Sequence, residues 1–165
     1  MVWTEIDVDR PLNEKEIQVA VGKTFGIAAE RVLVVADFGT DVAAIDPAIS
    51  LVVEHHTQPG DFPERMTFVM WDGQIRELTG AEETSEASYA AISALSSHLN
   101  ASVIAPDSEI DPYTAVLFTP SGDAYRIELD STILDDLGGV SISNHYPKVH
   151  APELSHLPQR HLMSS

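Results

Sequence analysis

The chain contains no cysteine among its 165 residues and only three lysines. Without cysteine, the protein has neither a disulfide framework nor a thiolate metal site. No apolar run approaches the roughly 18 residues of a membrane-spanning helix, and the first residues lack the basic and apolar regions of a secretion signal. We therefore expect a soluble, cytoplasmic protein with no membrane partner.

Basic residues are absent from residues 77–125, a stretch that contains eight carboxylates. The whole chain has 26 acidic residues against nine Lys and Arg, which gives a formal net charge of -17. Such a field repels nucleic acid and anionic membranes, and it attracts cations or a basic protein surface. We expect a basic protein as the partner and no nucleic acid. A salt-adapted host proteome is an alternative source of the same acidity.

Two acidic clusters are the candidates for binding this partner. The first lies where a helix is expected to begin, and the second lies in a loop between two expected strands. Their members are Glu82, Glu83, Glu86, Asp107, Glu109 and Asp111.

The alternation of Asp107, Glu109 and Asp111 resembles the first ligand positions of a calcium-binding loop. Such a loop needs glycine at position six and a bidentate glutamate at position twelve. Here these positions are Pro112 and Phe118. We interpret the segment as a solvated acidic loop.

Capping signals predict two helices. Asn13 and Glu16 can form a capping box, and Gly26 can serve as C-cap, so a helix is expected over residues 14–25. Thr79 and Glu82 predict the start of a second helix, which extends to about residue 98.

Alternating or continuous apolar runs predict the strands. Residues 5–8 are expected to form an edge strand, and residues 32–36 a strand buried on both faces. Asp72-Gly73 predicts a two-residue hairpin turn. Further strands are expected at residues 49–56, 66–71, 74–78, 102–105, 113–119, 124–129 and 140–143. The pattern predicts an α+β fold: a largely antiparallel sheet of about seven to nine strands with two helices packed on it.

The chain divides into a domain over residues 1–143 and a Pro/His-rich, extended C-terminal tail over residues 144–165. Ile-Asp-Pro occurs at residues 45–47 and again at residues 110–112. This leaves open a weak internal pseudo-repeat, in which residues 13–78 correspond to residues 82–143.

Four histidines in the tail form a candidate metal site: His145, His150, His156 and His161. Their spacing fits no rigid template for zinc, and structural zinc usually relies on cysteine. An extended tail without metal is therefore favoured. His55 lies in phase with the apolar residues of an expected strand, so we interpret it as a structural histidine with a hydrogen-bond partner.

No catalytic motif is present. Val21-Gly22-Lys23-Thr24 resembles the end of a phosphate-binding loop, but the first glycine of that loop is replaced by Ile17. We expect no cofactor and no catalytic residues. The favoured function is a noncatalytic acidic protein-binding module, such as an inhibitor, an immunity-type protein or a chaperone-like partner of a basic protein. The alternatives are a metal-dependent enzyme that uses the His-rich tail with acidic loop residues, and a self-associating protein such as a homodimer.

Overall fold

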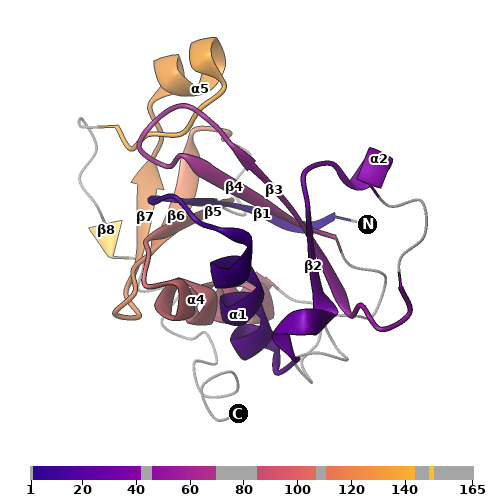
Figure 1. The fold of residues 1–165 in the computed structure, drawn as a ribbon. Coiled ribbons are helices and arrows are strands. Elements are labelled where there is room, and N and C mark those ends of the chain that lie inside the picture. Colours follow the sequence, from indigo (N-terminus) through magenta and orange to yellow (C-terminus); the bar gives the residue numbers. More distant parts are fainter. Residues whose placement is uncertain (1, 42–45, 70–84, 107–110, 144–148, 151–165) are drawn as a thin grey trace.

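A computed structural model of the chain describes residues 2–41, 46–69, 85–106, 111–143 and 149–150. These residues adopt an α+β fold built on one mixed, mostly antiparallel sheet (Figure 1). The strands are β1 (Val2–Val8), β2 (Val32–Val35), β3 (Leu51–Thr57), β4 (Glu64–Val69), β5 (Val103–Pro106), β6 (Thr114–Phe118), β7 (Ala124–Glu128) and the two-residue β8 (Val149–His150). The helices are α1 (Glu14–Phe25), α2 (Phe38–Asp41), α4 (Ser85–Leu99) and α5 (Ser131–Leu137), with a short 3-10 helix η1 (Ala29–Arg31).

The strand order is β2-β3-β4-β1-β5-β6-β7-β8. Among the described pairs, only β2 and β3 run parallel. The prediction that residues 5–8 form an edge strand is wrong, because β1 pairs on both sides. Asp7 lies opposite Arg65 of β4 and opposite Ile104 of β5. The first strand therefore joins the two halves of the sheet.

The prediction that residues 32–36 form a strand buried on both faces is also wrong. Strand β2 is the outermost strand of the sheet, and in it only Val32 is fully buried. A continuous apolar run does not distinguish a central strand from a parallel edge strand. An edge strand has a neighbouring strand on one side only, so its side chains are less buried.

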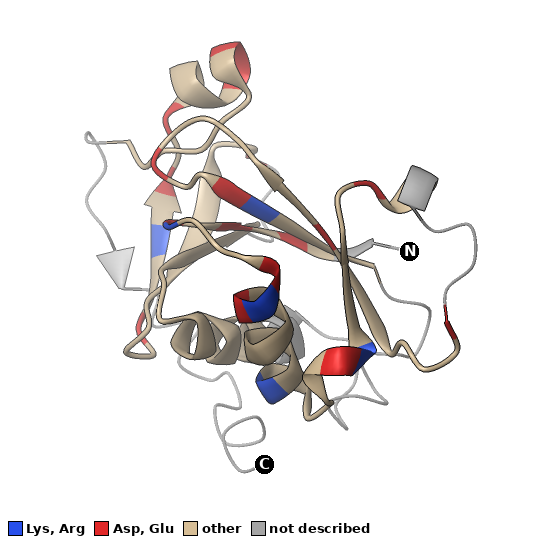
Figure 2. Cartoon of the chain, in the orientation of Figure 1, with Lys and Arg blue, Asp and Glu red and all other residues tan. Residues whose placement is uncertain are grey.

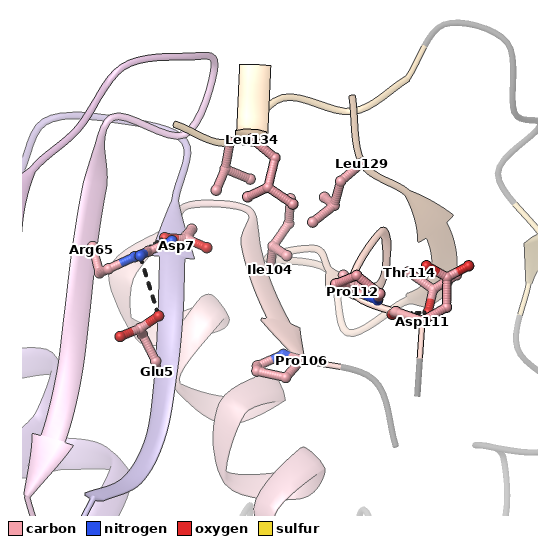
Figure 3. Close-up of a pocket in the computed structure, with 12 residues that line it drawn as sticks. Glu5, Asp7, Arg65, Ile104, Pro106, Asp111, Pro112, Thr114, Leu129 and Leu134 are labelled. Atoms are coloured by element: carbon pink, nitrogen blue, oxygen red, sulfur yellow. Dashed lines mark hydrogen bonds and ion pairs between the residues drawn. The ribbon is translucent and has the colours of Figure 1, made fainter. Parts of the chain in front are cut away.

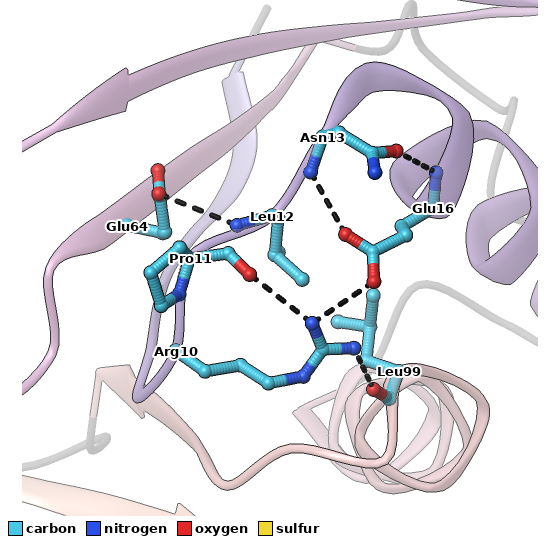
Figure 4. Close-up of polar contacts among 7 residues, drawn as sticks. All are labelled: Arg10, Pro11, Leu12, Asn13, Glu16, Glu64 and Leu99. Carbon is cyan, nitrogen blue, oxygen red and sulfur yellow. Dashed lines mark hydrogen bonds and ion pairs between the residues drawn. The ribbon is translucent and has the colours of Figure 1, made fainter.

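Helix α1 confirms the prediction from its caps (Figure 4). The amide of Glu16 donates to Oδ1 of Asn13 at 2.8 Å, and the amide of Asn13 donates to Oε2 of Glu16 at 2.9 Å. Gly26 closes the helix in the left-handed conformation, with a φ of 68°. These contacts satisfy backbone groups that would otherwise lack partners at the helix ends.

Helices α1 and α4 lie on one face of the sheet, which we call the first face (Figure 1). Ile6 and Val8 of β1 point into this core, where Phe25 of α1 packs edge-on against Phe68 of β4. Arg10 fastens the two helices by donating to Oε1 of Glu16 at 3.0 Å and to the carbonyl of Leu99 at 2.6 Å (Figure 4). The prediction of two helices packed on the sheet is confirmed.

The opposite, second face carries a smaller core beneath α5, a helix that the sequence analysis missed. Asp130 is its N-cap and accepts the amide of Ile133 at 3.1 Å, while Gly138 ends it with a φ of 66°. The buried members of this core are Phe62, Ile104, Ala115, Leu117, Ile127, Leu129 and Val140.

The loop between β3 and β4 holds the segment after α5 in place. The amide of Phe62 donates to the carbonyl of Val140, and the amide of Val140 donates to the carbonyl of Pro59, each at 3.1 Å. Two glycines allow this approach: a Cβ on Gly60 would collide with Val140, and one on Gly139 would collide with Pro59. The two backbone segments thus pair at a distance that side chains would prevent.

The remaining predictions divide into three groups. The strands expected at 49–56, 102–105, 113–119 and 124–129 are present within one or two residues as β3, β5, β6 and β7, and β4 covers most of 66–71. Residues 140–143 do not form a regular strand; within them, Ile142 pairs with Leu129 in an isolated bridge. The predicted turn at Asp72-Gly73, the strand expected at 74–78 and the predicted cap at Thr79 and Glu82 lie outside the described residues. No helix in the described part is long and apolar enough to cross a membrane.

Gly139→Ala tests the close approach of the two loops. The added methyl group would meet the carbonyl oxygen of Pro59, and only a shift of backbone relieves that overlap. We expect the free energy of unfolding to fall by about 1–3 kcal/mol, measured by urea denaturation. Gly39→Ala is the control, because its new Cβ would meet only the Asp37 side chain at 3.3 Å. If both variants match the wild type, the approach is looser than described.

Candidate functional site

A cleft of about 240 Å³ opens on the second face, between the centre of the sheet and the smaller core (Figure 3). Its walls combine charged and apolar groups. The charged residues are Glu5, Asp7, Arg65 and Asp111, and the apolar ones include Ile104, Pro106, Pro112, Leu129, Leu134 and Val140.

Strand alternation places the charged residues in this cleft. Because successive side chains of a strand point to opposite faces, the burial of Ile6 and Val8 beneath the helices directs Glu5 and Asp7 to the second face. On β4 the same rule directs Arg65 to the second face. None of these three residues was named from the sequence. The alternation over residues 5–8 was a signal for Glu5 and Asp7, but it gave none for Arg65.

Arg65 holds the two carboxylates of β1 together (Figure 3). Its Nε donates to Oδ1 of Asp7 at 2.9 Å, and its terminal nitrogen lies 3.3 Å from Oε1 of Glu5. Gln58 also donates to Oδ1 of Asp7, at 2.7 Å, and the hydroxyl of Thr67 donates to Glu5 at 3.3 Å. These contacts fix the carboxylates before any ligand arrives.

Burial raises the pKa of Asp7 above its usual range, against the opposing influence of Arg65 and Gln58. Asp7 is only 8% exposed, so its charged form loses most of its hydration. Burial also disfavours the cation of Arg65, but the hydrogen bond and charge of Asp7, together with the charge of Glu5, outweigh it and raise the pKa of Arg65. Arg65 therefore stays charged and faces more carboxylates than it can neutralise.

Asp111 stands at the other wall of the cleft. Its Oδ1 accepts the amide of Tyr113 at 2.9 Å, and its carbonyl accepts the hydroxyl of Thr114 at 3.1 Å. Tyr113 in turn donates its hydroxyl to Asp135 of α5 at 2.7 Å. Asp111 is thereby bonded to the start of β6, and Tyr113 joins this segment to α5.

Of the six acidic candidates, Asp111 is the one whose side chain the structure describes. Glu82, Glu83, Asp107 and Glu109 lie outside the described residues. Glu86 lies in α4, but the structure does not describe its side chain. The expectation that these residues bind a partner stays a prediction.

Among the histidine candidates, His150 lies in β8, which pairs with β7. His145, His156 and His161 lie outside the described residues. Within the part of the chain that the structure covers, no group of three or more His, Asp or Glu is arranged to hold a metal ion. His55 contacts Oε2 of Glu64 at 2.5 Å, which confirms its interpretation as a strand histidine with a partner.

A second cleft, of about 360 Å³, lies between α1 and the end of α4. Arg10, Lys15, Glu16 and His98 contribute its polar groups, but Arg10 is already bonded to Glu16 and to the α4 backbone. Burial and the charge of Lys23 lower the pKa of His98. We interpret this second cleft as part of the junction between the helices.

The cleft on the second face offers binding groups rather than a nucleophile with a base. The hydroxyl in its lining, that of Thr114, donates to a backbone carbonyl, and the carboxylates of β1 are paired with Arg65. Comparison of the chain with protein-family models, curated proteins and solved structures found no match. The interpretation of the site therefore rests on its own chemistry.

Asp7→Asn tests the buried carboxylate. The folded pKa of Asp7 is raised above its ordinary value of 3.8, so between these two values the folded protein holds a proton that the unfolded chain has released. Wild-type stability consequently falls as pH rises through this window, and the asparagine variant lacks that contribution. We expect the wild type to gain free energy of unfolding relative to Asp7→Asn as pH is lowered from neutral towards 3.8, measured by urea denaturation at several pH values. Asp61→Asn, at an exposed position, should follow the wild type. A wild-type advantage that does not change with pH would contradict the raised pKa.

Proposed function

We propose that this protein is a noncatalytic binding module that captures a basic partner protein through its acidic surface. Inhibition, immunity-type protection and chaperoning of that partner are the roles that such capture would serve. The observation that carries the proposal is the lining of one cleft by Glu5, Asp7 and Asp111, with Arg65 as the one Lys or Arg among its described lining residues.

The charge of the cleft favours a cationic partner. Glu5 is exposed, and so is Asp111 at the opposite wall. Both carboxylates can therefore stay partly hydrated while they attract a cation. Exposed charges of this kind mainly accelerate association and select the partner by its sign. Asp and Glu also occur along the other described elements, where Lys and Arg are fewer (Figure 2). The summed field would steer a basic protein towards the molecule before contact.

Apolar groups beside the carboxylates provide contact area. Leu134 lines the cleft, and Leu137 lies one helical turn further along α5 with 57% of its surface exposed. Residues three apart on a helix are neighbours on its surface. A partner segment with aliphatic as well as basic side chains would therefore bury apolar area next to its ion pairs. The ion pairs would raise the association rate, and the buried apolar area would add affinity.

Binding to a panel of fluorescent peptides tests the proposal. The panel contains peptides that combine Lys or Arg with aliphatic residues, and matched peptides in which Glu replaces the basic residues. We expect only the basic peptides to bind, and we expect the association rate to fall steeply with salt, because the Debye length is about 8 Å at physiological ionic strength.

Charge reversal locates the surface that binds. Asp111→Lys should slow association of the basic peptides by about tenfold, whereas Glu30→Lys, an equal change of net charge outside the cleft, should have a smaller effect. Reversal of Glu82, Glu83 and Glu86 together tests the other acidic cluster in the same assay. Failure of every basic peptide to bind, or an association rate indifferent to salt, would refute the proposal.

Metal content tests the alternative of a metal-dependent enzyme. We expect protein purified without an affinity tag to retain substoichiometric divalent metal after dialysis, measured by elemental analysis. We also expect chelation to leave the melting temperature unchanged, because a metal that binds only the folded state would raise it. Near-stoichiometric metal that is lost on His150→Ala and His156→Ala would favour the enzyme.

A further inference from the structure

We propose that the cleft between α1 and α4 binds a small oxyanion that carries an O–H donor, such as a hydroxycarboxylate or hydrogen phosphate. His98 accepts the hydroxyl group of this ligand at Nε2, and Lys15 supplies the positive charge for the anionic group. The two helices cover the first face of the sheet, whereas the acidic cleft lies on the second face. This inference is therefore independent of the proposed function.

Thr24 fixes the tautomer of His98. The hydroxyl of Thr24 donates its one proton to the carbonyl of Ala20 at 2.8 Å. In the contact of 2.9 Å between the same hydroxyl and Nδ1 of His98, the hydroxyl oxygen is consequently the acceptor and Nδ1–H is the donor. Because a neutral imidazole carries one proton, Nε2 keeps an unprotonated lone pair.

The side of the imidazole ring that holds Nε2 faces the cleft. Thr24 is buried and is not among the described lining residues, whereas His98 is exposed and lines the cleft. Since Nδ1 points towards Thr24, the opposite side of the ring is the part that His98 contributes to the lining. Among the described residues, no group donates to Nε2. This acceptor is thus available to a ligand.

The surroundings of His98 keep its imidazole neutral. Burial, and to a lesser extent the charge of Lys23, lower the pKa of His98 below its ordinary value of 6.5. The other two histidines whose side chains the structure describes, His55 and His56, each lie beside a glutamate carboxylate. Nε2 of His98 is therefore an acceptor at neutral pH in a place where no carboxylate competes for a proton.

Lys15 gives the cleft its unbalanced charge. The other charged residues of the described lining, Arg10 and Glu16, form an ion pair at 3.0 Å. No ion pair joins Lys15 to another residue in the part of the chain that the structure describes. Lys23 adds a second cation close enough to act on His98. Both lysines are basic positions of α1 (Figure 2), so the cleft attracts anions although the chain as a whole is acidic.

The cation and the acceptor together define the class of ligand. Lys15 requires a negative group, and Nε2 of His98 requires a donor. The cleft has a volume of about 360 Å³, which lies within the range of ligand pockets that begins near 300 Å³. Val19 and Ala20 of α1 line it as well, so a short carbon skeleton finds apolar contact there.

Two matched pairs of anions test the site in the full chain, slightly above neutral pH. Lactate differs from propionate by one hydroxyl group, and hydrogen phosphate differs from sulfate by its O–H donor. Affinities are measured by NMR titration. We expect the anion with the donor to bind about fivefold more tightly in at least one pair, because that is the usual effect of one hydrogen bond. The pair that shows this difference identifies the source of the ligand as an organic acid or inorganic phosphate.

Nitrogen NMR of the imidazole ring tests the acceptor directly. We expect His98 in the free protein to carry its proton on Nδ1 and to have an unprotonated Nε2. The resonance of Nε2 should shift when the preferred anion is added, because this atom then accepts a hydrogen bond. A proton on Nε2 of the free protein would overturn the proposal.

Substitutions then separate the two contacts. His98→Phe should abolish the preference within the pair and leave the anion without a donor bound as before. Lys15→Gln should weaken both anions by about threefold, as expected for an exposed ion pair. Arg31→Gln is the control, because it removes an equal charge at an exposed position outside the cleft. Melting temperatures close to that of the wild type show that the variants fold.

Several outcomes would overturn the anion site. These are absence of binding by both lactate and hydrogen phosphate, equal binding within both pairs, a preference that persists in His98→Phe, or no greater effect of Lys15→Gln than of Arg31→Gln. None of them bears on the basic peptides, whose binding tests the acidic surface separately.

Discussion

The pairing of β1 with strands from both halves of the chain is the constraint on which the rest of the structure depends. β1 lies between β4 and β5, so the N-terminal residues complete a sheet whose other strands are contributed much later in the sequence. Val8, for example, is in register with Glu64 on one side and Val103 on the other. Loss of this strand would separate β2-β3-β4 from β5-β6-β7 and leave two unpaired edges. Because such edges pair indiscriminately with other chains, the central position of β1 also protects the protein from aggregation.

The alternation within β1 then divides the molecule into two chemically different faces. Its apolar residues form the centre of the core beneath α1 and α4, and its acidic residues form the polar centre of the second face. Among the described residues, helix α5 and the loop between β3 and β4 cover one end of that second face. The cleft lies at the boundary between the covered apolar end and the polar centre. The cleft is lined by both carboxylates and aliphatic groups because the smaller core of the second face ends beside the acidic residues of β1.

Sequence reasoning succeeded where the signal was local. The caps of α1 and the alternation of β7 lie within a few residues of each other, and the structure has both as expected. It failed for the positions of β1 and β2, since strand order depends on pairings between distant segments that periodicity does not encode. Helix α5 was missed although Asp130 and Gly138 were recognisable caps, because its seven residues show too little periodicity. For the site, charge identified Asp111, but the ion pair between Glu5 and Arg65 is set by the register of β1 against β4.

The acidity of the chain has two explanations, and the geometry helps to separate them. Acidity that reflects a salt-adapted host would place solvated carboxylates on every surface, and exposed ones such as Glu30 and Asp123 fit that description. Asp7 does not, because it is only 8% exposed. Burial raises its pKa, so its contribution to stability is smaller at neutral pH than at acid pH. General solubility gains nothing from a charge in this position. Asp7 is instead paired with Arg65 across neighbouring strands, where the register of β1 against β4 places it. Composition alone therefore does not account for the position of this carboxylate.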